Sequence, residues 1–200
     1  MRRLPWLRII VHAVALAPLA LLALGWGMGR LGVDPVGEAL RRTGRCAILL
    51  LLLSLAPTAI RILSGRSEPL RLRRALGLYA FLYAVLHLAI LAGPDYGLDP
   101  AFLAPALLGR RELLGLLSLL ILAALALTST RGWVRRLGRA WKPLHRTVYV
   151  AAALAAAHYL WAAKEVRPGP ILYTAVLALL LIVRIPPVAR VLARRARRET

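Results

Sequence analysis

Long apolar runs separated by short polar connections dominate this sequence of 200 residues. Each of six runs approaches the ~20 residues that a helix needs to cross a hydrocarbon core about 30 Å thick. They extend over residues 7–28, 46–63, 75–93, 113–128, 147–163 and 171–188. The first run follows basic residues as a signal peptide would, but it is too long for the apolar core of one and no clear cleavage site follows it. The pattern therefore predicts an all-α, polytopic membrane helix bundle with six transmembrane helices.

The composition is that of a membrane protein. Hydrophobic residues make up 60% of the chain, the mean hydropathy is +0.69, and only 8 residues are acidic. A soluble domain of this length has no interior large enough to bury so many apolar side chains. We expect residues 1–200 to form a single transmembrane domain. The single cysteine, Cys46, excludes an intramolecular disulfide and a CxxC metal or redox site.

Basic residues lie in the connections between the runs, and their distribution predicts the orientation of the bundle. Counted as basic minus acidic residues, the N-terminal segment carries +3, the second connection +4, the fourth +6 and the C-terminal tail +5. The alternate connections carry +2, −1 and +1, so the totals are +18 on one side and +2 on the other. Because cytoplasmic connections are rich in Lys and Arg, we expect both termini in the cytoplasm. The +20 formal net charge then reflects topology in a lipid bilayer and not a nucleic-acid partner.

Two histidines lie inside predicted spans, where an ionisable side chain is costly and is a candidate functional residue. His87 lies 12 residues from the cytoplasmic start of its span and His158 lies 13 residues along its own, or ~18 and ~20 Å. Two imidazoles at one depth can ligate a haem iron from both sides, an arrangement suited to electron transfer. Tyr79 and Tyr83 share the stripe of His87, and the alanines before His158 leave room for a macrocycle. Ordinary interhelical hydrogen bonds and tight helix packing are the alternative.

His145 and His12 lie near the cytoplasmic boundary and can share a second level. His145 is 13 residues from His158, which on a straight helix is a rotation of ~220°, so the two do not share one face. A second haem at His145 needs an unusual partner such as His12. For His12 an interfacial polar role is the simpler interpretation.

Several stretches resemble one known family, the MsrQ (YedZ) proteins. They are RRALGLYAFLYAVLH (residues 73–87), LALTST (125–130), LGRAWKPLHRTVY (137–149) and AHYLW (157–161), and the resemblance extends over about residues 7–187. The family consists of haem-binding membrane subunits of the bacterial periplasmic methionine sulfoxide reductase system and is related to ferric-reductase-like transmembrane domains.

The resemblance implies a b-type cytochrome of the bacterial inner membrane. It implies that electrons pass from the respiratory quinone pool to a periplasmic molybdopterin enzyme, MsrP, which reduces methionine sulfoxide in envelope proteins. The haem-associated histidines of the family correspond to His87, His145 and His158, with haem b as cofactor. Members are also described as binding FMN, for which residues 131–146 are a candidate phosphate site; a linker lying on the lipid surface is the alternative for that basic loop. In the outer connection, Asp95 and Asp99 are candidate contacts of the partner.

Two other functions remain open. One is a stand-alone ferric or cupric reductase with the same bundle, which predicts metal reduction without a soluble partner. The other is a small transporter or assembly factor with structural histidines, which predicts a colourless protein. The predicted spans carry no carboxylate for a proton-coupled relay, which disfavours transport. In the favoured interpretation the chain transfers electrons and makes or breaks no substrate bond.

Overall fold

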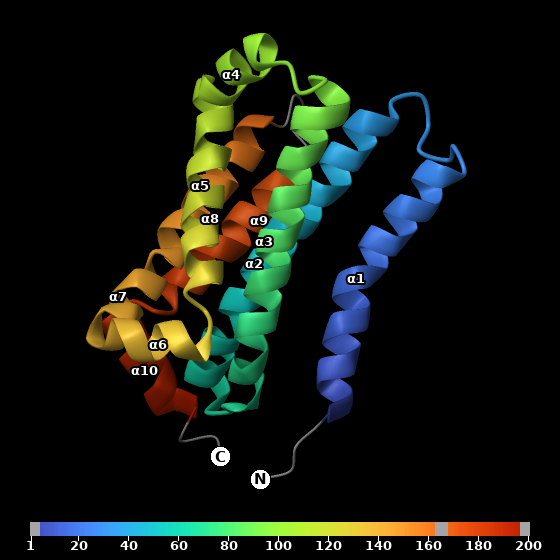
Figure 1. Ribbon diagram of the computed structural model, residues 1–200. Coiled ribbons are helices and arrows are strands. Elements are labelled where there is room, and N and C mark those ends of the chain that lie inside the picture. The colour runs from blue at the N-terminus through green and yellow to red at the C-terminus, as the bar shows by residue number, and fades with distance from the viewer. Residues whose placement is uncertain (1–4, 163–167, 197–200) are drawn as a thin grey trace.

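The computed structural model describes residues 5–162 and 168–196, and within them every element is helical (Figure 1). The long helices are α1 (Pro5–Gly27), α2 (Pro35–Ser64), α3 (Arg73–Ile90), α5 (Arg110–Leu127), α8 (Val148–Ala162) and α9 (Pro168–Ile182). The short ones are η1 (Glu68–Leu72), η2 (Leu91–Asp95), α4 (Pro100–Leu108), α6 (Arg131–Leu137), η3 (Gly138–Ala140), α7 (Trp141–Arg146) and α10 (Pro186–Ala196). The predicted all-α class is confirmed.

Three helices are by themselves long and apolar enough to cross a membrane, at Ile9–Gly27, Pro35–Ser64 and Glu68–Asp95. Two bent helix pairs raise the number to five if each pair is one span: Arg110–Leu127 with Arg131–Ala162, and Pro168–Ile182 with Pro186–Leu192. Length and composition thus support three to five spans. They do not reach the predicted six, because the bent pair that contains α5 and α8 counts as one span.

The helices α2, α3, α5, α8 and α9 form one bundle, and α1 stands along its side (Figure 1). In the figure α4 covers one end of the bundle, whereas α6 and α7 lie across the other end. The described chain also begins and ends at the end of the bundle where α6 and α7 lie. Helices α3 and α8 rise away from this end, and α2 and α5 return toward it.

Small residues let the helices of the bundle approach closely, as in other membrane helix pairs. Helix α2 contacts α1, α3, α8 and α9, and its Leu51 and Leu55 are buried in the core. Ala80 of α3 and Ala151 of α8 are completely buried in the same cluster. Ser118 of α5 donates a hydrogen bond of 2.9 Å to the Ala151 carbonyl and so joins α5 to α8.

Helix α2 begins at Pro35, 11 residues before the predicted span at residue 46, because its first turns are polar and well capped. Asp34 accepts a hydrogen bond of 2.8 Å from the backbone N–H of Gly37, and Pro35 has no N–H to leave unpaired. Glu38 then pairs with Arg41 at 3.0 Å and with Arg42 at 2.7 Å, one turn further on. Residues 35–45, predicted as an outer connection, are therefore helical.

The last predicted span, 171–188, ends earlier than expected. Helix α9 stops at Ile182, and the adjacent Pro186 and Pro187 begin α10, which turns away by 83°. At this bend Arg184 donates to the Leu55 carbonyl of α2, and its guanidinium lies 5.6 Å from the ring centroid of Tyr149. The break at Ile182 thus places a cation at the end of the bundle.

Candidate functional site

The structure brings the imidazole rings of His87 of α3 and His158 of α8 close together. Their ring centroids are 6.3 Å apart and the ring planes are inclined by 80°. Both side chains are partly buried between helices. The equal depths counted from the sequence thus correspond to direct proximity of the two imidazoles.

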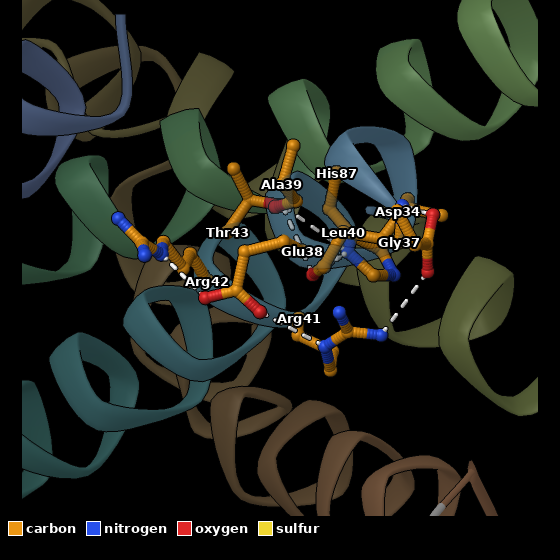
Figure 2. Close-up of polar contacts among 9 residues, drawn as sticks. All are labelled: Asp34, Gly37, Glu38, Ala39, Leu40, Arg41, Arg42, Thr43 and His87. Carbon is orange, nitrogen blue, oxygen red and sulfur yellow. Dashed lines mark hydrogen bonds and ion pairs between the residues drawn. The ribbon is translucent and has the colours of Figure 1, made fainter. Parts of the chain in front are cut away.

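The backbone of α2 fixes the tautomer of His87 (Figure 2). The Nδ1 atom lies 3.0 Å from the Leu40 carbonyl oxygen, which can only accept, so Nδ1 carries the proton. The Thr43 hydroxyl donates to the Ala39 carbonyl at 2.7 Å, and its oxygen lies 3.4 Å from the same Nδ1. A neutral His87 therefore keeps the lone pair on Nε2.

The Leu40 carbonyl that accepts the hydrogen bond from His87 belongs to the capped first turns of α2. Asp34, Glu38 and the two arginines that bind them surround the turn that carries Leu40, as Figure 2 shows. A Cβ at Gly37 would lie 1.9 Å from Asp34 Oδ2, so any other residue at this position would displace the capping carboxylate. The polar segment that the sequence assigned to a loop thus orients the His87 imidazole.

His158 is held in the same way by α5. Its Nδ1 lies 2.9 Å from the Arg111 carbonyl oxygen in the first turn of that helix. The carbonyl again accepts, so the proton is on Nδ1 and the lone pair on Nε2. Glu112 accepts hydrogen bonds from the Arg111 side chain beside this carbonyl.

Each histidine ring also lies against a glycine one helical turn beyond its carbonyl partner. A Cβ on Gly44 would lie 3.2 Å from Cε1 and Nδ1 of His87, and one on Gly115 would lie 3.1 Å from Nδ1 of His158. Both distances are tighter than ordinary van der Waals contact, which begins near 3.4 Å. Sequence reasoning missed both glycines. Each glycine stands four residues after the residue whose carbonyl accepts the histidine proton. The signal is a glycine inside a helix, where alanine is intrinsically favoured.

The pair fits two axial ligands of one metal centre. A bond between a metal ion and an imidazole nitrogen is about 2.0–2.1 Å long and the nitrogen lies roughly 1.1 Å from the ring centroid, so two imidazoles on opposite sides of one ion have centroids about 6.3 Å apart. The observed centroid distance is 6.3 Å. Histidines that bind metals commonly donate their second N–H to a backbone carbonyl or a carboxylate. Both His87 and His158 have this arrangement.

His145 lies apart from this pair, on α7 at the end of the bundle. It stacks on Trp141 with ring centroids 4.0 Å apart, and its Nε2 lies 3.2 Å from the Thr128 hydroxyl oxygen. That hydroxyl donates to the Ala124 carbonyl at 2.7 Å, so Nε2–H is the donor and Nδ1 has the lone pair. Burial lowers the pKa of His145, with a smaller contribution from the charge of Arg73. The ring is therefore favoured in its neutral, ligating form.

His145 lines a cavity of about 650 Å³ between α2, α3, α5, α7 and α8. The lining combines apolar side chains with five cationic ones, and among the described residues that line the cavity none is acidic. Its cationic residues are Arg61, Arg73, Arg74, Lys142 and Arg146. The aromatic rings of Trp141 and Tyr149 contribute to the same wall. Such a cavity is suited to a flat ligand that carries negative groups at one edge.

His12 is not brought to His145. Its Nδ1 lies 2.7 Å from the Tyr79 hydroxyl between α1 and α3, and α1 contributes no described residue to the cavity around His145. The hydrogen bond to Tyr79 is consistent with the simpler interpretation of His12 as an interfacial polar residue. Asp99, one of two candidate contacts of a partner, caps α4 by accepting a hydrogen bond of 2.8 Å from the N–H of Ala101.

Comparisons with known proteins identify the family. A family described as the ferric reductase like transmembrane component matches residues 43–156, more than half of the chain. A relative from Xanthomonas axonopodis pv. citri is 43% identical over 183 residues, which cover 87% of this chain and 83% of the relative. The chain belongs to the MsrQ family. A second MsrQ protein, from Yersinia pseudotuberculosis, is 41% identical over 92% of both chains, and one from Yersinia pestis strain Pestoides F is 41% identical over 92% of this chain.

These MsrQ relatives are named as heme-binding subunits of a protein-methionine-sulfoxide reductase. The ferric-reductase-like match includes His87 and His145 and ends two residues before His158. The membership in the MsrQ family predicted from the sequence stretches is thus confirmed.

Proposed function

We propose that this chain is the membrane electron-transfer subunit of a methionine sulfoxide reductase system and that it binds a b-type haem through Nε2 of His87 and of His158. The observation that carries the proposal is the pair of imidazoles 6.3 Å apart, each with its Nδ1 proton held by a backbone carbonyl. The names of the MsrQ relatives support the choice of haem. When bound, the haem supplies a centre that accepts and releases one electron at a time.

The residues of the chain position this centre and do not act on a substrate. The Leu40 and Arg111 carbonyls orient the two rings, and each hydrogen bond increases the basicity of the opposite ring nitrogen. Gly44 and Gly115 let the rings lie directly on the helix backbones. Two histidine ligands leave no open position on the iron, so we expect no bond to a substrate to be made or broken in this chain.

We further propose six crossings of the bacterial inner membrane, with both termini in the cytoplasm. The +18 against +2 distribution of charge supports this orientation. The described chain begins and ends at the end of the bundle where the basic helices α6 and α7 lie, as an even number of crossings requires (Figure 1). The packing of α5 on α8 through Ser118 supports two separate crossings in place of one bent span. His87 and His158 then lie in the outer half of the membrane.

The outer position of the histidine pair suits an electron acceptor outside the membrane. We propose that the electrons come from the quinone pool and pass to a periplasmic molybdopterin-containing methionine sulfoxide reductase. The subunit names of the MsrQ relatives support a catalytic partner. A stand-alone ferric or cupric reductase predicts instead that the chain reduces these metal ions in the absence of a partner protein.

The cavity at His145 is a candidate second cofactor site. Its five cations and its aromatic wall favour a planar ligand with carboxylates or a phosphate. We propose a second haem, with Nδ1 of His145 as one ligand, or an FMN whose phosphate contacts these cations. Cofactor analysis of wild type and His145→Ala distinguishes them, because a haem gives iron and a Soret band, whereas FMN gives neither.

The proposal is tested by the absorption spectrum of purified protein before and after reduction. We expect a b-type Soret band and α band in the wild type, and loss of the low-spin signal in His87→Ala and in His158→Ala. His12→Ala is the matched control, since it removes an imidazole that does not contact this pair. Retention of a full complement of low-spin haem in either of the first two variants would show that the ligand assignment is wrong.

A further inference from the structure

His12 is the fourth histidine of the chain, and the haem site has no role for it. It lies on α1 only three residues, or about 5 Å, after the start of the apolar segment Ile9–Gly27. Its side chain is exposed among exposed apolar neighbours, Ile9, Ile10 and Val14. Because the His12 side chain is exposed on a helix that is apolar enough to cross a membrane, the imidazole is accessible to a molecule dissolved in the bilayer near the proposed cytoplasmic surface.

The His12 imidazole forms a close pair with a phenol. Its Nδ1 and the Tyr79 hydroxyl oxygen are 2.7 Å apart, and the ring centroids are 5.6 Å apart. Either group can be the donor in this hydrogen bond. When Nδ1–H donates, Nε2 can accept a hydrogen bond or a proton and the phenol O–H is free to donate. When the phenol donates, Nε2–H becomes a donor. The pair therefore offers complementary partners to a hydroxyl and to a carbonyl oxygen.

The pair is also connected to the proposed redox centre. Tyr79, Tyr83 and His87 follow one another at intervals of four residues on the same face of α3. The completely buried Tyr83 donates a hydrogen bond of 2.8 Å to the Ala15 carbonyl of α1, one turn beyond His12. A stripe of aromatic side chains on α3 thus begins at the His12–Tyr79 pair and ends at His87, a proposed haem ligand.

We propose that His12 and Tyr79 form the site at which the headgroup of a lipid-soluble hydroquinone is bound and oxidised. A hydroquinone loses two O–H bonds and becomes a quinone with two C=O groups, releasing two protons and two electrons. His12 Nε2 accepts the first proton, and the second passes to water at the nearby cytoplasmic surface. The two electrons would be accepted one at a time by two oxidised haem equivalents, for which His87 and His158 would be the ligands. The oxidation step rests on the proposed function, because it needs the haem as electron acceptor. The hydroquinone-binding site does not depend on that function.

Photolabelling tests the binding site directly. The full-length protein in lipid nanodiscs is exposed to a decyl benzoquinone that carries an azido group, and the labelled peptides are located by mass spectrometry. We expect label on α1 and α3 around residues 12 and 79. We expect at least about tenfold less label in His12→Leu and in Tyr79→Phe, because each removes a hydrogen-bonding partner of the headgroup.

Tyr83→Phe is the matched control, since it removes the neighbouring hydrogen bond between α3 and α1 without changing the pair. If the His12–Tyr79 contact only holds α1 on the bundle, all three variants will lower the melting temperature and none will selectively reduce labelling. That result, or label concentrated on the cavity at His145, would overturn the proposal.

The rate of haem reduction by decyl benzoquinol separates this inference from the proposed function. We expect wild type and Tyr83→Phe to be reduced at similar rates and His12→Leu at least about tenfold more slowly, with unchanged reduction by dithionite and an unchanged spectrum. If wild-type haem accepts electrons from the quinol and His12→Leu is equally fast, the His12 site is wrong although the function stands. If wild type has no haem or is not reduced by quinol, the proposed function fails, and labelling alone then decides the binding site.

Discussion

The substitution Gly115→Ala tests whether the helix backbone sets the position of the His158 imidazole. The added Cβ would lie 3.1 Å from Nδ1 and 3.2 Å from Cε1 and Cγ, whereas ordinary contacts begin near 3.4 Å. The ring must therefore move away from α5 by a few tenths of an ångström. This movement lengthens the 2.9 Å hydrogen bond from Nδ1 to the Arg111 carbonyl, which is worth about 0.5–1.5 kcal/mol. Because loss of such an outer hydrogen bond lowers metal affinity by about 10–100-fold, we expect faster haem loss of that order.

The assay is the transfer of haem from the purified variant to an excess of an apo-haem acceptor protein. Gly27→Ala is the control, because nothing lies within 4 Å of the Cβ that it adds in α1. Alanine favours a helix over glycine by about 1 kcal/mol, so Gly115→Ala should not unfold the protein for local reasons. Wild-type haem retention together with a wild-type low-spin spectrum in Gly115→Ala would refute the reasoning.

Three further substitutions test the packing around the site by thermal unfolding in detergent, where about 1 kcal/mol corresponds to roughly 2–4 °C for a chain of this size. Ser118→Ala removes the buried hydrogen bond to the Ala151 carbonyl, and we expect a loss of about 0.6 kcal/mol, typical of membrane helix contacts; no change would mean that this bond does not join α5 to α8. Arg184→Met removes the hydrogen bond from the guanidinium to the Leu55 carbonyl and should cost about 1.5–3 kcal/mol, the usual range for a hydrogen bond with a charged partner; a stabilised variant would contradict the role assigned to this cation. Asp34→Ala removes the N-cap of α2 and should cost about 0.5–2 kcal/mol, whereas an unchanged melting temperature would show that the cap is dispensable.

The apolar runs and the histidine positions were sufficient to predict the centre of the fold. A run near 20 residues leaves few structures other than a helix, so the helices at residues 5–27 and 73–90 and the apolar part of the helix at 35–64 follow from hydropathy. Counting residues from the basic ends placed His87 and His158 at one level, because the rise of a helix is constant. Their rings lie 6.3 Å apart in the structure.

Features that depend on polar local interactions or on side chains from several helices were not predicted. The start of α2 was assigned to a connection because its charges lower the hydropathy, although Asp34 and Pro35 form a helix start that capping rules recognise. The glycines beside the histidines have no signal in composition, because their role is a close contact with another helix. The cavity at His145 is built from five helices, so no local pattern in the sequence describes it.

The site repeats one arrangement on two helix pairs, and this repetition explains why so few side chains define it. In each pair a histidine on a helix that runs away from the α6 and α7 end donates Nδ1–H to a carbonyl near the start of a helix that runs toward that end, and a glycine follows that carbonyl by four residues. The acceptors are backbone atoms, so the side chains of Leu40 and Arg111 can vary without removing them. A substitution at either glycine, in contrast, introduces a Cβ directly against the ring. Orientation of the two imidazoles is therefore specified by helix register and by the absence of side chains at two positions, while the chemical identity of the site is specified by the two histidines.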